Sequence, residues 1–447
     1  MRTRRRAFAL ITGAAMTIAV AVAVAPDGMA AVSTADAAAI ACSATVWAEG
    51  NTYTAGTQVT YQGHLYQALV THTAYVGAGW NPASTPSLWT DLGACTGGPT
   101  TPPTTTPPTT TPPTTTPPTT TPPTTTPPTG GTCAVKSRPA GKVLVGYWEN
   151  WDGASNGVHP GLGWVPVTDS RLGQHGYNVI NAAFPVIRSD GTVLWEDGMD
   201  AGVKIATPAE MCQAKASGAT ILMSIGGAAA GIDLSSSAVA DRFVATIVPI
   251  LKKYNFDGID IDIETGLTGS GNIGTLSASQ ANLIRIIDGV LAQMPSNFGL
   301  TMAPETAYVT GGSVTYGSIW GAYLPIIKKY ADNGRLWWLN MQYYNGSMYG
   351  CAGDSYQAGT VQGFVTQTQC LNSGLVVQGT TIRVPYDKQV PGLPAQPGAG
   401  GGYMSPSLVA QAYGSVSGIK GLMTWSANWD GSRGWTFGDN VRALQGR

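Results

Sequence analysis

Residues 257–264 read Asp-Gly-Ile-Asp-Ile-Asp-Ile-Glu, so that isoleucines alternate with acids. Adjacent side chains in a β-strand point to opposite faces. A strand here places its isoleucines on one face and Asp260, Asp262 and Glu264 on the other, with about 6.5–7 Å between successive acids. Burying three carboxyl groups so close together is costly unless they share protons or accept hydrogen bonds. The run therefore predicts a strand with a function.

Apolar runs of strand type recur after residue 140, and helical patterns separate them. They lie at residues 143–148, 177–184, 220–225, 258–264, 299–303, 336–344, 389–394 and 421–426. Between them, residues 239–251 and 283–294 carry apolar side chains at helical spacing. Eight strands that alternate with helices predict an α/β fold, the (β/α)8 TIM barrel, with its active site at the C-terminal ends of the strands.

Glu264 lies at the C-terminal end of the fourth predicted strand. Negative charge nearby raises the pKa of a carboxyl group, and a raised pKa keeps a general acid protonated. The structural alternatives are a solvated edge strand with alternating acids and a cation site. Calcium sites, however, favour oxygen ligands on flexible loops over a rigid strand. We therefore expect Glu264 to be a catalytic proton donor.

The composition indicates an uncharged partner. Charged residues make up 11% of the chain and the formal net charge is −1, whereas 13 Trp and 18 Tyr supply aromatic faces. Nucleic-acid binding requires a basic face, so no nucleic-acid partner is expected. A neutral polysaccharide suits this composition, and we expect a monomer.

The N-terminal residues 1–39 have the pattern of an export signal. Several arginines precede an uncharged apolar stretch at residues 7–24, and small residues follow it. An uncleaved membrane anchor is the alternative, because a stretch of this length almost spans a bilayer. Its Ala, Gly and Thr content dilutes the hydrophobicity that an anchor needs. We expect a secreted, extracellular protein with no membrane contact once the signal is cleaved.

A linker is predicted at residues 96–132, where Pro-Pro-Thr-Thr-Thr repeats contain no large apolar residue that could form a core. Such prolines favour the extended polyproline II conformation. The linker separates a folded unit at residues 40–95 from the barrel at residues 133–447.

The unit at residues 40–95 is predicted to be a small all-β module. Residues 58–61 and 64–68 flank Gln-Gly as a hairpin, and the unit has more aromatic residues than a core of its size needs. Its aromatic pattern, including Gly-Trp-Asn-Pro at residues 79–82, resembles the chitin-binding modules of families 5 and 12. The resemblance implies that Trp80 presents its ring to the polysaccharide, with His72, Thr73 and Pro82 near it. Tyr75 is also expected to bind chitin.

Six cysteines in an exported chain are expected to pair as disulfides. Cys42 and Cys95 bracket the small module and should close it. Cys351 and Cys370 lie near each other across a short segment. By elimination, the remaining pair is Cys133 with Cys212.

The motifs of the barrel resemble those of family 18 chitinases across residues 141–447. Residues 257–264 match the D-G-x-D-x-D-x-E signature, and Ser-Ile-Gly-Gly at residues 224–227 matches S-x-G-G. Met-Gln-Tyr-Tyr-Asn at residues 341–345 and Trp425 complete the pattern. Residues 395–420 leave no room for the additional α+β domain that some members insert there. The resemblance is therefore to bacterial members with a short, hevamine-like catalytic domain, an open cleft and endo-type cleavage.

This resemblance implies a mechanism in which the substrate supplies the nucleophile. Glu264 protonates the glycosidic oxygen, and the N-acetyl group of the −1 sugar attacks its own anomeric carbon to form an oxazolinium ion. Asp262 orients the acetamide, and Asp260 shares a proton with Asp262. Tyr344 hydrogen-bonds the acetamide oxygen and Trp425 forms the floor of the −1 subsite. The configuration is retained, and neither a metal nor a cofactor is required.

Other residues at strand ends are expected to bind chitin or chito-oligosaccharides. They are Tyr147, Met302, Gln342 and Asn345. For Glu305, at the end of the fifth predicted strand, substrate contact and structural hydrogen bonding remain equally open.

Two other functions are compatible with these motifs. A non-catalytic chitin-binding lectin of the same family typically lacks the acid, whereas Glu264, Asp262 and Tyr344 are all present here. An endo-β-N-acetylglucosaminidase acting on N-glycans uses the same mechanism, but the predicted chitin-binding module argues against it. Chitin hydrolysis is the expected function.

Overall fold

The structure is a computed structural model. It describes residues 42–48, 51–54, 56–69, 72–74, 81–83, 89–95, 131–153, 162–228 and 231–447. The predicted export signal lies outside these residues, as do most of the predicted linker and the side chains of Trp80, Tyr75 and His72. In the described part of the chain, no helix is both long and apolar enough to cross a membrane.

Eight parallel strands form the barrel, and they correspond to the eight predicted runs. In sheet order they are β13 (Leu336–Leu339), β12 (Gly299–Met302), β11 (Gly258–Asp262), β10 (Thr220–Gly226), β7 (Val179–Ala183), β6 (Val143–Glu149), β19 (Gly421–Trp425) and β18 (Gly392–Pro394). Backbone bridges from Leu339 to Gln389 and from Gln342 to Gly392 join the last strand to the first and close the sheet. The TIM barrel is therefore confirmed.

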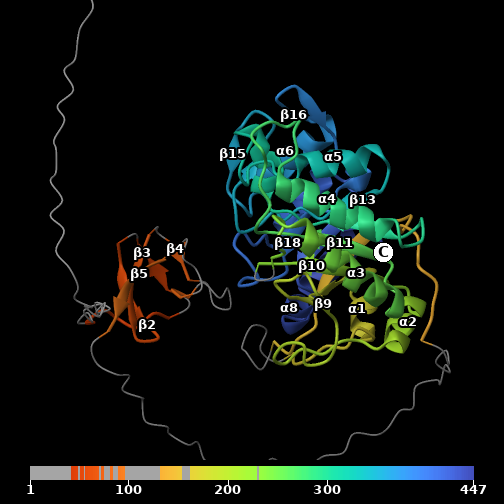
Figure 1. The fold of residues 1–447 in the computed structure, drawn as a ribbon, viewed down its shortest axis with the longest axis horizontal. Helices are drawn as coiled ribbons and strands as arrows, with labels where there is room; N and C mark the ends of the chain where they lie inside the picture. Colours follow the sequence, from red (N-terminus) through yellow and green to blue (C-terminus); the bar gives the residue numbers. More distant parts are fainter. Residues whose placement is uncertain are drawn as a thin grey trace, which may run out of the picture.

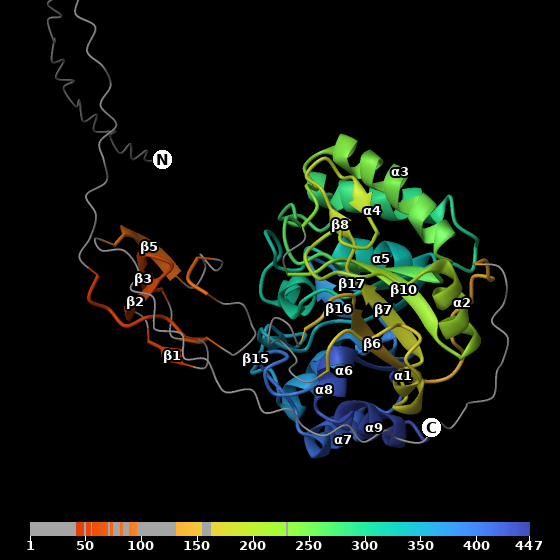
Figure 2. The same ribbon diagram turned by 90° about the horizontal axis from the view of Figure 1, so that it is seen from below.

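Helices surround this barrel (Figures 1 and 2). They are α1 (Ser170–Gln174), α2 (Pro208–Ala216), α3 (Ser237–Lys253), α4 (Ala278–Leu291), α5 (Leu324–Asp332), α6 (Val361–Ser373), α7 (Pro406–Ser415), α8 (Ala427–Ser432) and α9 (Thr436–Leu444). Three 3-10 turns accompany them at η1 (Thr306–Tyr308), η2 (Thr310–Ser313) and η3 (Tyr386–Lys388). Between β18 and β19 the chain forms α7 and no additional domain.

Short antiparallel hairpins lie in the connections between the barrel strands. They are β8 (Val186–Ile187) with β9 (Val193–Leu194), β14 (Met348–Tyr349) with β15 (Ser355–Tyr356), and β16 (Leu375–Val377) with β17 (Thr380–Ile382).

The alternation along β11 separates two environments, as the sequence predicts. Ile259, Ile261 and Ile263 are fully or almost fully buried in the core shared with the helices, where the apolar faces of α3 and α4 pack. Asp260 and Asp262 are also buried, but they point into the barrel, because neighbouring residues of a strand face opposite sides.

The N-terminal module contains β1 (Thr52–Tyr53), β2 (Gln58–Tyr61), β3 (His64–Ala68), β4 (His72–Thr73) and β5 (Trp89–Ala94). The predicted hairpin is present as β2 and β3. Its turn residues Gln62 and Gly63 both have positive φ, of 47° and 79°, which is the two-residue turn that matches strand twist. A disulfide between Cys42 and Cys95 closes the module as expected.

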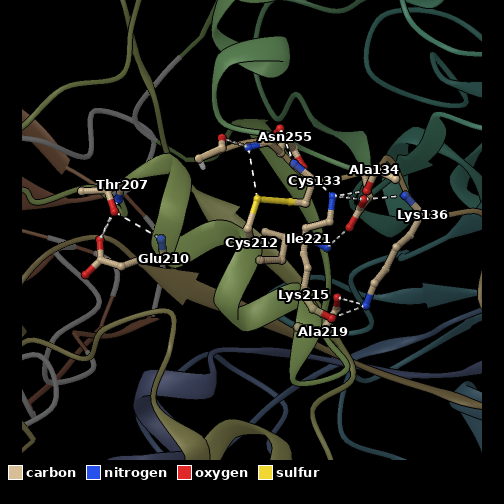
Figure 3. Close-up of a disulfide and its surroundings, with 12 residues drawn as sticks. Cys133, Ala134, Lys136, Thr207, Glu210, Cys212, Lys215, Ala219, Ile221 and Asn255 are labelled. Atoms are coloured by element: carbon tan, nitrogen blue, oxygen red, sulfur yellow. Dashed lines mark hydrogen bonds and ion pairs between the residues drawn. A yellow bond between two sulfur atoms is a disulfide. The ribbon is translucent and has the colours of Figure 1, made fainter. Parts of the chain in front are cut away.

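The strap that enters the barrel, residues 131–142, is fixed at the N-terminal end of the strands (Figure 3). The Cys133–Cys212 disulfide joins it to α2, and Lys215, one turn further along α2, donates to the carbonyl of Ala134 at 2.8 Å. Lys215 also forms a buried ion pair of 2.6 Å with Asp257. Asp257, the first acid of the sequence motif, is therefore a structural residue far from the predicted reaction centre along its strand.

Removing the Cys133–Cys212 disulfide should destabilise the fold more than removing Cys351–Cys370. The two bridges span 79 and 19 residues, so loop entropy predicts losses of about 4.5 and about 3 kcal/mol respectively. Paired Cys→Ser variants compared by urea unfolding test this order. A larger loss for the shorter bridge contradicts it.

Candidate active site

The two glycines of the S-x-G-G motif allow β10 to approach the acidic strand closely. Gly226 has a φ of 108°, and a Cβ added there would lie 2.1 Å from the carbonyl oxygen of Asp262. The N–H of Gly227 donates to the same oxygen at 2.7 Å. These contacts fix the backbone of Asp262, so any larger residue at position 226 displaces it.

Asp260 is completely buried and accepts hydrogen bonds from four neutral donors. The hydroxyls of Tyr147 and Ser224 donate to its Oδ2 at 2.6 and 2.8 Å. The hydroxyl of Thr301 and the amide of Asn340 donate to its Oδ1. Burial raises the pKa of Asp260, and these hydrogen bonds oppose the rise. Four donors match the lone pairs of an ionised carboxylate.

The proton-sharing partner of Asp262 differs from the expectation. No hydrogen bond joins Asp260 to Asp262 in the described barrel, because neutral donors occupy the oxygens of Asp260. Asp262 is instead hydrogen-bonded to Glu264. Two carboxyl groups can make this bond only if one carries a proton, so Asp262 and Glu264 share a proton at the barrel mouth.

Gln342 bridges this acid pair. Its Nε2 lies 2.9 Å from Asp262 Oδ1, 2.9 Å from Glu264 Oε1 and 3.0 Å from the carbonyl of Ala303. Burial and then the charge of Glu264 raise the pKa of Asp262 well above its usual range. Burial also raises the pKa of Glu264, which favours the protonated form that a general acid needs.

Two tyrosines hold the backbone on which Glu264 stands. Tyr323 Oη accepts from the N–H of Ile263 and donates to its carbonyl, both at 2.9 Å. Tyr308 donates to the carbonyl of Glu264 at 2.6 Å. Glu264 lies two residues beyond the end of β11, so these contacts replace the sheet hydrogen bonds that no longer support it.

Tyr344 and Asn345 follow β13 at the same rim. Tyr344 is 6% exposed, and its hydroxyl has no hydrogen-bond partner among the described residues. The Oδ1 of Asn345 accepts from the N–H of Gly401 at 2.7 Å, and the Asn345 N–H donates to the Gly401 carbonyl at 2.9 Å. Asn345 thus joins two rim loops, while Tyr344 Oη remains free to bind a ligand.

Aromatic rings line the other side of the barrel mouth. Trp425, partly buried at the end of β19, stacks on Phe184 with centroids 6.0 Å apart and lies 5.6 Å from the ring of Tyr147. Tyr147 is only 1% exposed and its hydroxyl is committed to Asp260. It therefore supports the acid, whereas we expected it to line the substrate site.

Met302 is the one expected substrate residue whose side chain faces the wrong way. It is fully buried in the core between barrel and helices and pairs in register with Ile261, which belongs to the same core. Thr301, its neighbour, faces the barrel interior instead. The expectation for Met302 was wrong because it did not apply the two-residue alternation to this strand.

The interpretation of the sequence missed Thr301 and Asn340 as partners of Asp260. Each is a polar residue in an otherwise apolar run, two positions before Ala303 and Gln342 respectively, and that alternation places both inside the barrel. It also missed Glu149, a fully buried acid that accepts from the hydroxyl of Ser426 next to Trp425.

Thr301→Val should destabilise the protein, because it removes one donor from a buried carboxylate without changing side-chain shape. We expect a loss of about 1–3 kcal/mol at neutral pH. Urea unfolding of this variant against the exposed control Thr315→Val measures it. Equal stability of the two variants contradicts the assignment of Asp260 as a hydrogen-bonded anion.

Glu305 introduces a pH dependence of stability. Burial and the charge of Glu264 raise its pKa from 4.5 to about 7. The folded state therefore holds this proton more tightly than the unfolded chain, and the stability that Glu305 contributes below pH 4.5 is lost as the pH rises through about 7. The melting temperature of Glu305→Gln relative to the unmodified protein should rise between pH 4.5 and 8. A constant difference contradicts this.

Comparison with known proteins identifies the family. The model of glycosyl hydrolases family 18 matches residues 143–335, and that of carbohydrate-binding module family 5/12 matches residues 46–90. Endochitinase 4 of Metarhizium robertsii is 82% identical over 312 residues, covering 70% of this chain and 90% of that protein. Endochitinase 37 of Trichoderma harzianum is 80% identical over 310 residues, covering 69% and 92%. Both relatives are fungal, so the comparisons do not support a bacterial branch.

A solved structure agrees with this result. The family GH18 chitinase from Chromobacterium violaceum superposes with a TM-score of 0.60 at 29% identity, covering 91% of this chain and all of that one. The chain therefore belongs to family 18 of the glycosyl hydrolases and carries a carbohydrate-binding module of family 5/12.

Proposed function

We propose that this protein is a secreted endo-acting chitinase that hydrolyses β-1,4 bonds between N-acetylglucosamine units with retention of configuration. Its membership of family 18 and its similarity to two fungal proteins named endochitinases support the activity. The observation that carries the mechanism is the pair of Asp262 and Glu264 at the barrel mouth, each of which has a carboxyl oxygen 2.9 Å from Gln342 Nε2.

In the first step Glu264 protonates the glycosidic oxygen as the bond to the −1 sugar breaks. The carbonyl oxygen of the −1 acetamide attacks the anomeric carbon of the same sugar, and an oxazolinium ion forms. Asp262 accepts a hydrogen bond from the acetamide N–H and stabilises the positive charge. The buried anion Asp260 adds a fixed negative charge below this pair.

In the second step Glu264, now ionised, accepts a proton from water, and the water oxygen attacks the anomeric carbon. The oxazolinium ring opens and regenerates the acetamide. Tyr344, whose hydroxyl has no partner in the described structure, donates to the acetamide oxygen and orients it. Trp425 forms the apolar floor beneath the −1 sugar, which suits the face of a pyranose ring.

The remaining parts of the chain deliver the barrel to a solid substrate. We infer that the N-terminal module binds chitin, because its family is a carbohydrate-binding one. The linker at residues 96–132 tethers the barrel to the bound module and keeps it at a high effective concentration near the polymer. An open cleft therefore needs no additional contacts with the chain to stay on the solid substrate. Three disulfides suit an extracellular protein.

Glu264→Gln should lower kcat on soluble chito-oligosaccharides by about 10²–10⁴-fold, because it removes the transferable proton and little else. The matched control is Glu196→Gln, which changes an exposed acid that does not belong to the motif at residues 257–264. Both variants should still bind insoluble chitin in a sedimentation assay.

Product analysis separates the alternatives. The unmodified protein should release β-anomers from oligosaccharides, seen by NMR early in the reaction, and internal fragments from colloidal chitin. Release of glycans from a high-mannose glycoprotein without chitin cleavage favours an endo-β-N-acetylglucosaminidase. Full activity of Glu264→Gln overturns the assignment of the acid.

A further inference from the structure

Glu305 stands at the barrel mouth directly beside the reaction centre. It follows β12 and precedes η1, and its backbone forms a parallel bridge with Gln342. Every second residue of this segment faces the inside of the barrel: Thr301 donates to Asp260, and Ala303 packs in the inner cluster of the barrel. Glu305 is the next residue on this face, so its side chain points into the cleft rather than toward the helices.

The surroundings of Glu305 contain acids and hydroxyls. After burial, the charge of Glu264 raises the pKa of Glu305. The charge of Glu305 in turn helps to raise the pKa values of Tyr308 and Tyr344. Within the part of the chain that the structure describes, no ion pair involves Glu305, Asp260, Asp262 or Glu264. A ligand at this position therefore meets carboxyl groups without a competing cation, and a cationic ligand favours the ionised form of Glu305.

The carboxyl group of Glu305 is also the one acid of this group that the described protein leaves without a hydrogen bond. Asp260 has four donors, and Gln342 donates to both Asp262 and Glu264. A structural role predicts donors of this kind around Glu305. Their absence in the described residues, together with the partial exposure of Glu305, favours the other alternative that the sequence leaves open, contact with the substrate.

We propose that Glu305 is a specificity-determining residue that contacts the sugar chain and favours a deacetylated, cationic glucosamine unit at that position. An ammonium group supplies the charge-assisted hydrogen bond that an acetamide cannot. The −1 sugar must keep its acetyl group, because that group is the nucleophile. The glucosamine unit selected by Glu305 is therefore a neighbour of the −1 sugar, and the natural substrate class is partly deacetylated chitin. This inference rests on the proposed function.

The test compares the unmodified protein, Glu305→Gln and the charge-matched control Glu196→Gln on one partly deacetylated chitosan at pH 6.5. Mass-spectrometric sequencing of the products gives the ratio of glucosamine to N-acetylglucosamine next to the cleaved bond. We expect Glu305→Gln to lower this ratio by about 5–10-fold, the effect of one partly exposed charge-assisted hydrogen bond. Glu196→Gln should keep the ratio.

A second measurement does not depend on turnover of chitosan. Fully deacetylated glucosamine oligomers should inhibit cleavage of acetylated oligomers, and Glu305→Gln should weaken this inhibition by a similar factor. An unchanged product ratio and unchanged inhibition overturn the proposal. So does an equal loss of activity on acetylated and deacetylated chains, which indicates a structural role. Absence of cleavage of acetylated oligomers by the unmodified protein instead overturns the proposed function.

Discussion

A negative charge inside the barrel is the constraint on which the site depends. Asp260 is fully buried, and ionised carboxylates are not tolerated in such places without donors. Strands β6, β10 and β12 contribute Tyr147, Ser224 and Thr301, and Asn340 follows directly after β13. Because the donors come from four different parts of the sheet, a closed barrel is needed to assemble them around a single residue.

The four acids of the motif have different roles, which depend on their position along the strand. Asp257, at the N-terminal end, neutralises the buried Lys215 and anchors the entering strap. Asp260 is held by neutral donors. Asp262 and Glu264 share a proton at the mouth, where Gln342 holds both. The same side-chain chemistry thus produces an ion pair, a fixed anion and an acid, and solvation and partners decide which.

Rigidity around Glu264 comes from residues that never meet the substrate in the proposed mechanism. Gly226 and Gly227 fix the carbonyl of Asp262, and Tyr308 and Tyr323 fix the backbone that follows. Glu264 itself lies beyond the sheet, so without these contacts its carboxyl group is free to move. A proton donor must stay within about 0.5 Å of its productive position, and these contacts provide that support.

The sequence by itself determined the barrel and its eight strands, because period-two alternation and strand order are local properties of the chain. The spacing of the cysteines predicted the three disulfides. The sequence also predicts Glu264 as the acid. It predicted a partner for Asp262 but chose Asp260 in place of Glu264, and it assigned Met302 to the cleft. Only the tertiary structure decided these points. Which carboxyl groups are within hydrogen-bonding distance, and which donors from other strands reach them, depends on barrel closure and on the stagger between strands, and neither is encoded in any one segment.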